Sequence, residues 1–500
     1  MTQWLNSGRI LRSVCWAVWI AVVVCAVCSL SWRYVNDTPI MLYLSNLMVR
    51  HHAIPYRDFF DMNLPGSYWM FGMIIRIFGT SDFSMHFANL FVIAAISGLM
   101  YWAMSGSCCW GAVLGVGLGA LRILSGEWAF VLQRELFALV PVSVLLVLGL
   151  RQPIKGVPAA GMVGLLVAWL ALIKPQLSLY GIPVALLLVS ECENWRQRVH
   201  LIALMGCGFL LPVVACGMWL VKNDAWTGFL EVVQYWPLYG QMTHGFEFVS
   251  AHERVFALML GVWKMLCSPY IVVAIYGIYV GWERKSLSAK ESFLWLGLLA
   301  LTVVVPAVSG QFWGYHRLPF FYLALCASGY LVLGRAYAKG LCVLLAVFWI
   351  SFAGVRVWRE TSHPSIVSLK YGVPDAFGDY LKVHLQPGDR VQPVDWACGS
   401  LHGMLMVDAL PATRFPYSFY FLHHVSHPLI QKLRQEYMDS LKKNPPRFVL
   451  EATTVPMPSG MDTEKRFEAF ETWRASHYRM VAEDEHYRIW ELAEHAELEN

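Results

Sequence analysis

Three aspartates lie close together between two hydrophobic runs near the N-terminus. Asp37 stands in "WRYVNDTPIML", and Asp58 and Asp61 stand in "IPYRDFFDMNLPG". A carboxylate at such a place can accept a proton from a hydroxyl group as a general base. Simpler explanations exist, because Asp37 could cap a helix that begins near Pro39, and the other two could be solvated charges paired with Arg57. The stretch alone does not decide between chemistry and local structure.

Further charged residues lie at the ends of later hydrophobic runs, in the segments "LQREL", "LIKPQ" and "GYHRLP". Each has a structural explanation. Arg134 and Glu135 could form a salt bridge at a membrane rim, and Lys174 could extend its ammonium group to the interface. His316 with Arg317 could mark the end of a span. Taken together, these groups could instead converge with the aspartates above one cavity.

The composition of the chain indicates a membrane protein. Of its 500 residues, 57% are hydrophobic and only 14% are charged, whereas a soluble domain has about 25% charged residues. The hydrophobic residues form long runs, which is typical of a polytopic membrane protein. The formal net charge of +4 is small, and the basic residues are scattered between the runs. We therefore expect no nucleic acid partner.

Hydropathy predicts about eleven transmembrane helices, each near the ~20 residues that cross a bilayer. The predicted spans are 13–31, 84–104, 108–124, 130–150, 157–173, 176–190, 201–221, 256–281, 293–309, 316–334 and 339–355. Basic residues in the short loops, for example Arg284 and Lys285, place the N-terminus in the cytoplasm. With an odd number of spans, the aspartates, Lys174, His316 and the residues after 355 all lie on the outer face.

The first outer loop, residues 32–83, is predicted to contain two short helices. Hydrophobic residues from Pro39 to Arg50 follow roughly one face of a helix, and the run from Leu64 to Phe78 is too short to span a membrane. Pro55 and Pro65 would interrupt the helices on either side of the acidic loop. We expect both helices to lie along the membrane surface.

The residues after 355 have more charge and ordinary turn signals. Strand patterns occur in "GDRVQPVDW", "RFVLEA", "YRMVAED" and "YRIWEL", and "HPLIQKLRQEYMDSLKK" has the period of an amphipathic helix. We therefore divide the chain into a transmembrane domain, residues 1–355, and an extracytoplasmic α/β domain, residues 356–500.

The first outer loop also resembles that of a known family. The stretch "PIMLYLSNLMVRHHAIPYRDFFDMNLPGSYWMFGMIIRIFGTSDF" is similar to the first outer loop of the GT-C glycosyltransferases, membrane enzymes that use sugars carried on polyprenyl phosphate. "QREL", "LIKPQ" and "GYHRLP" resemble segments of bacterial members, of the protein O-mannosyltransferase and aminoarabinose transferase type. Asp37 matches the first carboxylate of the family, and Asp61, with Asp58 nearby, matches its second acidic motif. From the family pattern we expect a glycine-bearing turn before "AIPYRDFF". The pair His51 and His52 stands there instead and departs from this pattern.

The resemblance implies an inverting sugar transfer by direct displacement. Asp37 would be the general base, with Asp61 or Asp58 in support. Because the phosphate leaves without a dedicated acid, cations have to stabilise it. The candidate phosphate ligands are Arg57, Arg134, Lys174, His316 and Arg317. Candidates for acceptor binding or for support of the site are Gln133, Glu135, Tyr56 and Tyr315. As an alternative, Asp37 and Asp61 could share a divalent metal ion, although no compact ligand set appears in the sequence.

The implied partners are a polyprenyl-phosphate-linked sugar, membrane lipid, and a glycan, lipid or protein acceptor. Hexosyl and pentosyl transfer both stay open, and the implied location is a bacterial inner membrane. Two other classes of function compete: a transporter or flippase whose outer cations capture an anionic envelope precursor, and a non-catalytic component of envelope polysaccharide assembly. Transporters typically have paired broken spans with midplane polar groups, so we favour sugar transfer.

Overall fold

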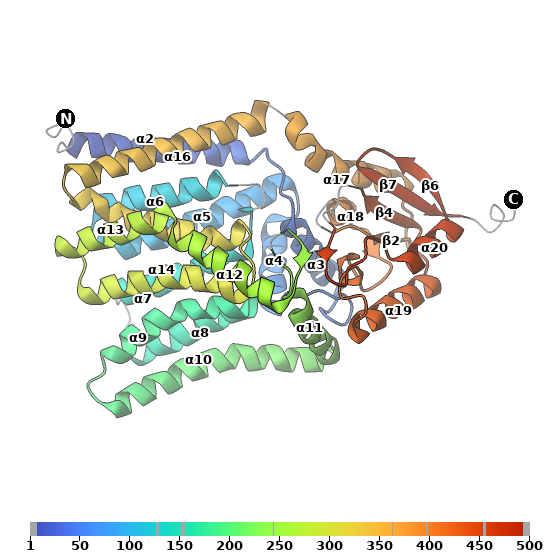
Figure 1. The fold of residues 1–500 in the computed structure, drawn as a ribbon, viewed down its shortest axis with the longest axis horizontal. Helices are drawn as coiled ribbons and strands as arrows, with labels where there is room; N and C mark the ends of the chain where they lie inside the picture. Colours follow the sequence, from blue (N-terminus) through green and yellow to red (C-terminus); the bar gives the residue numbers. More distant parts are fainter. Residues whose placement is uncertain are drawn as a thin grey trace. The chain divides into compact units, whose positions relative to one another are not determined.

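The computed structural model describes residues 8–126, 130–151, 156–243, 245–362, 364–396, 399–453 and 457–493. The chain forms two compact units, each assembled from segments that are distant in the sequence (Figure 1). The membrane unit contains the described residues within 1–32, 85–216 and 258–363. The α/β unit contains those within 33–84, 217–257 and 364–500. The first outer loop therefore packs with the C-terminal residues, whereas the division at residue 355 assigned it to the transmembrane domain.

The membrane unit consists of helices that run beside one another (Figure 1). They are α2 (Gly8–Ser29), α5 (Asp82–Ser105), α6 (Cys109–Leu124), α7 (Arg134–Arg151), α8 (Val157–Ile173), η2 (Pro175–Gly181), α9 (Ile182–Ser190), α10 (Trp195–Lys222), α12 (Ala251–Leu266), α13 (Pro269–Glu283), α14 (Ala289–Ser309), η3 (Tyr315–Arg317), α15 (Leu318–Ser328), η4 (Gly329–Leu333) and α16 (Ala336–Ser362). One end each of α5, α10 and α12 continues into the α/β unit.

Every predicted span coincides with a helical segment. Within the described residues, six helical segments are long and apolar enough to cross a membrane, and α12 with α13, bent by 48°, would make a seventh. The other four predicted spans fall on α6, α7, α8 and the pair η2 and α9, which are shorter or carry more charge. A helical fold with six or seven candidate spans is thus confirmed, and the number eleven stays a prediction.

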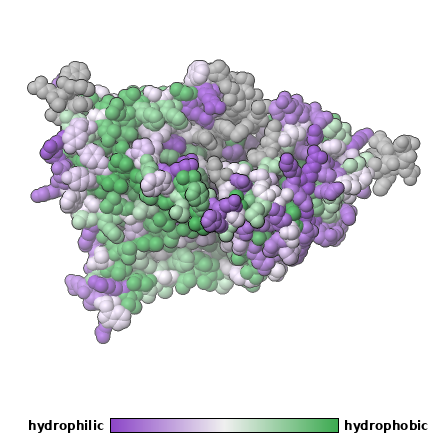
Figure 2. All heavy atoms as spheres, viewed as in Figure 1, coloured by the Kyte–Doolittle hydropathy of each residue, from purple (hydrophilic) through white to green (hydrophobic). Residues whose placement is uncertain are grey.

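The outward-facing side chains of these helices are apolar. In the most hydrophobic stretch of α10 only 6% of the residues are buried, and Figure 2 shows hydrophobic side chains over the exposed helix faces of this unit. In water such a surface would be costly, whereas lipid chains can cover it. The surface therefore fits a multi-pass membrane protein.

Glycines let α6 approach α15 and the start of η4 closely. A Cβ atom on Gly111 would lie 2.7 Å from the carbonyl oxygen of Gly329, and one on Gly115 would lie 2.5 Å from that of Cys326. A third glycine one turn on, Gly119, packs against the ring of Tyr322. Small residues at intervals of four allow two helices in a membrane to pack backbone against backbone. This packing holds α15, whose first turn follows the candidate residues His316 and Arg317.

The α/β unit contains both predicted helices of the first outer loop, α3 (Asp37–His51) and α4 (Pro65–Phe78). His52 ends α3 with a left-handed φ of 55°, so a histidine occupies the place where we expected glycine. However, α3 is buried at every residue from Thr38 to Leu47, because α4 and α18 (Ser400–Met406) pack against it. Protein therefore covers α3 on more than the one face that the periodicity indicated, and its position along the membrane surface stays a prediction.

The C-terminal part of this unit is built on a five-stranded mixed sheet with the strand order β3-β2-β4-β7-β6. Strand β2 is parallel to β3 and β4, whereas β7 is antiparallel to β4 and β6. The strands are β2 (Arg390–Pro393), β3 (Leu410–Pro411), β4 (Phe448–Ala452), β6 (Tyr478–Glu483) and β7 (Tyr487–Leu492). The other elements are α11 (Trp226–Tyr239), α17 (Pro364–His384), η5 (Phe419–Phe421), α19 (Pro428–Lys443), α20 (Glu468–His477), and the paired β1 (Glu247–Phe248) and β5 (Ser459–Gly460). The four predicted strand segments and the predicted helix at 428–443 are confirmed.

Candidate functional site

Asp37 is the first residue of α3 and is partly exposed. The N-cap position belongs to Asn36, whose side chain makes no capping hydrogen bond. Asn36 has φ 65° and ψ −121°, a conformation that non-glycine residues rarely adopt. Asp37 therefore occupies the first helical position and not the N-cap itself. Strained backbone of this kind persists only where its surroundings hold it, and it is frequent at functional sites.

The residues just before Asp37 are held by the C-terminal part of the same unit. The guanidinium of Arg33 donates two hydrogen bonds of 2.7 Å to the Asp375 carboxylate and lies 3.3 Å from Asp82. The ring of Tyr34 stacks on His402, with 4.5 Å between ring centroids. Two contacts therefore fix the backbone that leads into the strained turn.

Two buried histidines of this unit predict acid sensitivity. His402 and His423 are 4% and 0% exposed, and burial lowers the pKa of each to about 3. In the unfolded chain a histidine titrates near ~6.5. The unfolded state therefore takes up protons first as the pH falls, and stability is lost progressively from about pH 6.5 down towards pH 3.

Between pH 6.5 and 5.5 the protonation of each of these histidines in the unfolded state should lower the free energy of unfolding by about 1 kcal/mol. We expect the Tm of the wild type to decrease over this interval. Thermal unfolding at pH 7.5, 6.5 and 5.5 measures this effect. The doubly substituted variant His402→Gln with His423→Gln should show a flatter dependence, and an unchanged slope would assign the effect to other groups.

Asp61 is fully buried and accepts hydrogen bonds from every side. One carboxylate oxygen accepts from the hydroxyl of Tyr68 at 2.6 Å and from the side-chain amide of Asn63 at 2.6 Å. The other accepts from the hydroxyls of Tyr417 at 2.7 Å and Tyr420 at 3.2 Å. Burial and then the Asp61 carboxylate raise the pKa of Tyr417 well above its ordinary value, so its hydroxyl stays a donor. The Asp61 carboxylate therefore joins three segments of the chain: its own loop, α4, and the stretch that contains Tyr417 and Tyr420.

Asp58 pairs with its sequence neighbour. Its carboxylate accepts two hydrogen bonds of 2.8 Å from the guanidinium of Arg57 and one of 2.7 Å from the backbone N–H of Ile54. Burial opposes the shift, but these partners hold the pKa of Asp58 below its usual value. Tyr56 is buried, and its hydroxyl donates to the carbonyl of Asn63 at 2.5 Å. Asp58 therefore forms the exposed ion pair with Arg57 that their adjacency in the sequence made possible.

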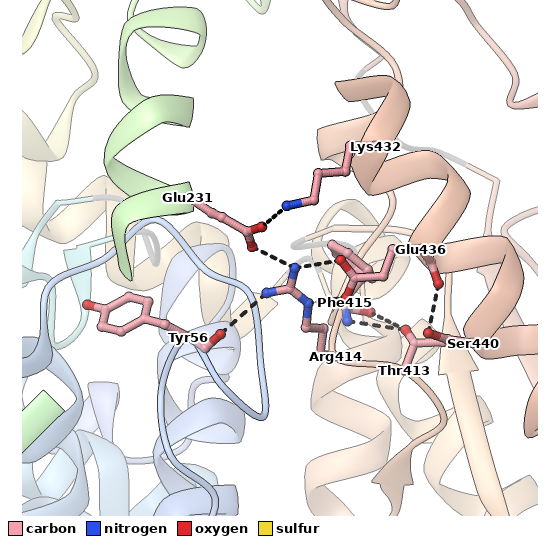
Figure 3. Close-up of polar contacts among 8 residues, drawn as sticks. All are labelled: Tyr56, Glu231, Thr413, Arg414, Phe415, Lys432, Glu436 and Ser440. Atoms are coloured by element: carbon pink, nitrogen blue, oxygen red, sulfur yellow. Dashed lines mark hydrogen bonds and ion pairs between the residues drawn. The ribbon is translucent and has the colours of Figure 1, made fainter. Parts of the chain in front are cut away.

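Arg414, which the sequence did not single out, connects the acidic loop to two helices (Figure 3). Its guanidinium pairs with Glu231 of α11 at 2.9 Å and with Glu436 of α19 at 2.7 Å, and it donates to the carbonyl of Tyr56 at 3.3 Å. It also lies 5.3 Å from the ring centroid of Phe60, whose backbone N–H donates to the Arg414 carbonyl at 2.7 Å. One side chain therefore holds the loop between Tyr56 and Phe60.

Replacing Arg414 with alanine is expected to destabilise the α/β unit by about 3 kcal/mol, because two carboxylates lose their shared cation. Arg414→Lys should recover only part of this loss, since an ammonium group cannot form the forked contact. Chemical denaturation checks both variants. The control is Lys432→Ala, whose side chain is 63% exposed and pairs with Glu231. It should change the stability by less than ~1 kcal/mol, and equal losses in Arg414→Ala and this control would contradict the prediction.

In the membrane unit, three predicted residues from separate segments meet. Lys174 lies between the end of α8 at Ile173 and the start of η2 at Pro175. The ammonium of Lys174 pairs with the Glu135 carboxylate. The Nε2 atom of His316 lies 3.4 Å from this ammonium and 3.6 Å from the Glu135 carboxylate. The Nδ1 atom of His316 lies 3.0 Å from the carbonyl of Gln311. Because a carbonyl only accepts, Nδ1 carries the proton, and Nε2 is left to accept from Lys174.

Some buried hydrogen-bonding groups in and near this cluster are not satisfied by the described residues. A cavity of about 10 Å³, room for about one water, is lined by Glu135 and His316 among others. The second carboxylate oxygen of Glu135 and the side-chain nitrogens of Gln133 and Gln311 are buried without a hydrogen-bond partner among the described residues. The ammonium nitrogen of Lys174 lies 5.7 Å from the ring centroid of Tyr315. The cluster therefore has capacity for a further polar group.

Two arginines lie over one aromatic ring of the same unit. Arg317 is 6.0 Å and Arg122 is 4.4 Å from the ring centroid of Phe321. Arg122 also lies over the rings of Phe130 and Trp349, at 5.1 and 5.3 Å. Arg122 is not among the residues predicted from the sequence, although its position at the outer end of a predicted span was a usable signal. The charged side chains named here for the membrane unit are thus mostly cations, with the Glu135 carboxylate paired to Lys174.

The structure thus places the candidates in two sets. Asp37, Tyr56, Arg57, Asp58 and Asp61 lie in the α/β unit, and Gln133, Arg134, Glu135, Lys174, Tyr315, His316 and Arg317 lie in the membrane unit. The convergence of all these groups stays a prediction.

The described residues do not fit the alternative in which Asp37 and Asp61 share a metal ion. Both oxygens of Asp61 already accept hydrogen bonds. In the described part of the chain, no group of three or more histidine, cysteine, aspartate or glutamate side chains could hold a metal.

Comparison with known proteins identifies the fold. No family model and no curated protein sequence matches the chain. Among solved structures, ArnT from Cupriavidus metallidurans bound to undecaprenyl phosphate is 12% identical, with a TM-score of 0.58, and the match covers 95% of this chain and 97% of that one. ArnT from the same organism in the apo state is 11% identical, with a TM-score of 0.57 and coverage of 97% and 98%. The chain therefore has the fold of these ArnT structures over nearly its whole length, as its resemblance to a known family led us to expect.

Proposed function

We propose that this chain is a GT-C glycosyltransferase that moves a sugar from a polyprenyl-phosphate donor to an acceptor hydroxyl. The observation that carries the proposal is the fold. A structure that matches nearly the whole chain is ArnT bound to undecaprenyl phosphate. The proposed location is a bacterial inner membrane, with the transfer on its outer face.

In the proposed reaction the acceptor oxygen attacks the anomeric carbon of the sugar. The bond between that carbon and the phosphate oxygen breaks, and polyprenyl phosphate leaves. Asp37 takes the proton of the acceptor hydroxyl as general base. The attack comes from the side opposite the phosphate, so the anomeric configuration inverts. The strained turn at Asn36 and its tethers support this role for Asp37, because they give the carboxylate a defined place.

The departing phosphate needs cations, and we propose that they come from the membrane unit. Lys174 and His316 form the centre of the cluster, and Arg134, Arg317 and Arg122 are further candidates. Glu135 holds the Lys174 ammonium until a phosphate competes for it. Arg57 is a weaker candidate, because Asp58 already occupies its guanidinium.

Asp61 and Asp58 have supporting roles in this proposal. The saturated hydrogen bonding of Asp61 supports a role in fixing the acidic loop, and the pairing of Asp58 with Arg57 supports a role on its surface. Glu135, Gln133, Tyr56 and Tyr315 likewise orient neighbours. The sugar, hexose or pentose, and the acceptor, glycan, lipid or protein, are left to experiment.

The test uses purified protein in liposomes, a panel of polyprenyl-phosphate hexoses and pentoses, and envelope extract as the source of acceptor. We expect release of polyprenyl phosphate from one class of donor. Movement of a labelled donor between leaflets without release would support the transporter alternative. The absence of both release and movement would favour the assembly component.

A further inference from the structure

Leu132 has an unusual backbone conformation just before the residues Gln133, Arg134 and Glu135. Its φ is 51°, in the left-handed region, and its side chain is fully buried. For a bulky residue this conformation is a true outlier, because the Cβ atom crowds the backbone. Something in the surroundings has to hold the chain in this shape.

The group that holds it comes from a different helix. The backbone N–H of Leu132 donates a buried hydrogen bond of 3.0 Å to the side-chain oxygen of Asn89 in α5. Asn89 is only 4% exposed. A buried N–H without a partner is costly, so this bond favours the strained conformation over relaxed ones in which the N–H points elsewhere.

The turn at Leu132 determines where the next residues lie. The carbonyl of Gln133 accepts from the N–H of Leu136 at 2.9 Å, so α7 starts within three residues of the turn. Glu135 lies in the first turn of α7, and its carboxylate pairs with Lys174. A change of φ at Leu132 would redirect this carboxylate away from Lys174 and His316.

We propose that Asn89 is a positioning residue that acts through the Leu132 backbone to place Glu135, and through Glu135 to place the Lys174 ammonium. Its effect on sugar transfer rests on the proposed function, whereas its effect on the placement of Lys174 does not.

The test compares Asn89→Leu, which removes the acceptor at similar volume, with Asn89→Asp, which keeps an acceptor oxygen. The matched control is Ser97→Ala, another buried polar residue of α5. Two readouts separate positioning from plain destabilisation. One is the rate at which an amine-acylating reagent modifies Lys174, followed by mass spectrometry below the Tm. The other is the split between the donor KM and kcat.

We expect Asn89→Leu to increase the acylation rate of Lys174 and to lower kcat/KM about 10- to 100-fold, mainly through the donor KM. Ser97→Ala should stay near the wild type. Asn89→Asp keeps the acceptor oxygen but buries a carboxyl group, so it should change Lys174 acylation less than Asn89→Leu does. A lower Tm with unchanged Lys174 acylation and unchanged donor KM would overturn the proposal, because a merely structural role predicts that result.

Leu132→Gly supplies a second test, since glycine adopts φ 51° without strain. In a Leu132→Gly background, Asn89→Leu should change Lys174 acylation far less than in the wild-type background. If the two backgrounds respond equally, or if Asn89→Leu fails to fold in both, Asn89 does not act through Leu132 and the proposal fails. If no donor is turned over by the wild type, the acylation readout still decides the positioning role.

Discussion

Asp37→Asn is expected to bind a polyprenyl-phosphate sugar donor normally and to transfer its sugar about 10²–10⁴ times more slowly than the wild type. An amide cannot accept the proton of the acceptor hydroxyl. At the first position of α3, loss of the negative charge from the helix N-terminus costs only about 0.3–1 kcal/mol. The variant should therefore keep a Tm close to that of the wild type. Single-turnover release of polyprenyl phosphate, donor binding and thermal unfolding together measure the three quantities.

The matched control is Asp58→Asn, which changes a neighbouring carboxylate in the same way. Because Asp58 forms a largely exposed pair with Arg57, the loss should be less than about fivefold, as exposed pairs contribute ~0–1 kcal/mol. Full activity in Asp37→Asn with strong loss in Asp58→Asn would reverse the assignment of the general base.

Asp61→Ala is expected to lower the stability of the α/β unit by about 3 kcal/mol or more. The substitution removes the acceptor of the Tyr417 hydroxyl and of the Asn63 amide, at about 1–3 kcal/mol each. The hydroxyls of Tyr68 and Tyr420 keep only their bonds of 3.2 Å to the carbonyls of Asn63 and Phe60. Transfer activity should disappear together with the folded protein. Denaturation monitored by tryptophan fluorescence, with activity measured on the same samples, checks whether the two losses run in parallel.

Graded variants around Asp61 provide the control. Tyr417→Phe removes one donor and should cost only about 1 kcal/mol, with transfer retained below the Tm. Asp61→Asn should lie between Tyr417→Phe and Asp61→Ala. If Asp61→Asn keeps its stability but loses transfer as completely as Asp37→Asn, then Asp61 takes part in the chemistry, and its role in fixing the loop is secondary.

The order of residues along the chain predicted those parts of the structure that depend on short-range patterns. Runs of apolar residues predicted every helical segment of the membrane unit, because a helix satisfies its own backbone in lipid. The bounds of α3 and α4 followed from Pro65 and from the periodicity after Asp37. Alternating patterns predicted the strands β2, β4, β6 and β7. The family resemblance of the first outer loop and of three shorter segments predicted the fold found over nearly the whole chain.

Other properties required the tertiary structure, because the deciding partners are remote in sequence. Asp61 looked like a solvated or catalytic carboxylate, and it is buried because Tyr417 and Tyr420, over 350 residues away, supply its hydrogen bonds. Arg414 had no local signal at all, since the loop it holds lies at the other end of the chain.

The division into units likewise depends on contacts between segments that are distant in the sequence. Hydropathy assigns the first outer loop to the membrane part by its neighbours in sequence, whereas α3 is buried by α4 and α18. The sequence by itself thus determined which segments are helices and strands and which residues are chemically able to act. The tertiary structure decided which of these residues are neutralised, saturated or strained, because burial and long-range pairing set the free energy of each charged group.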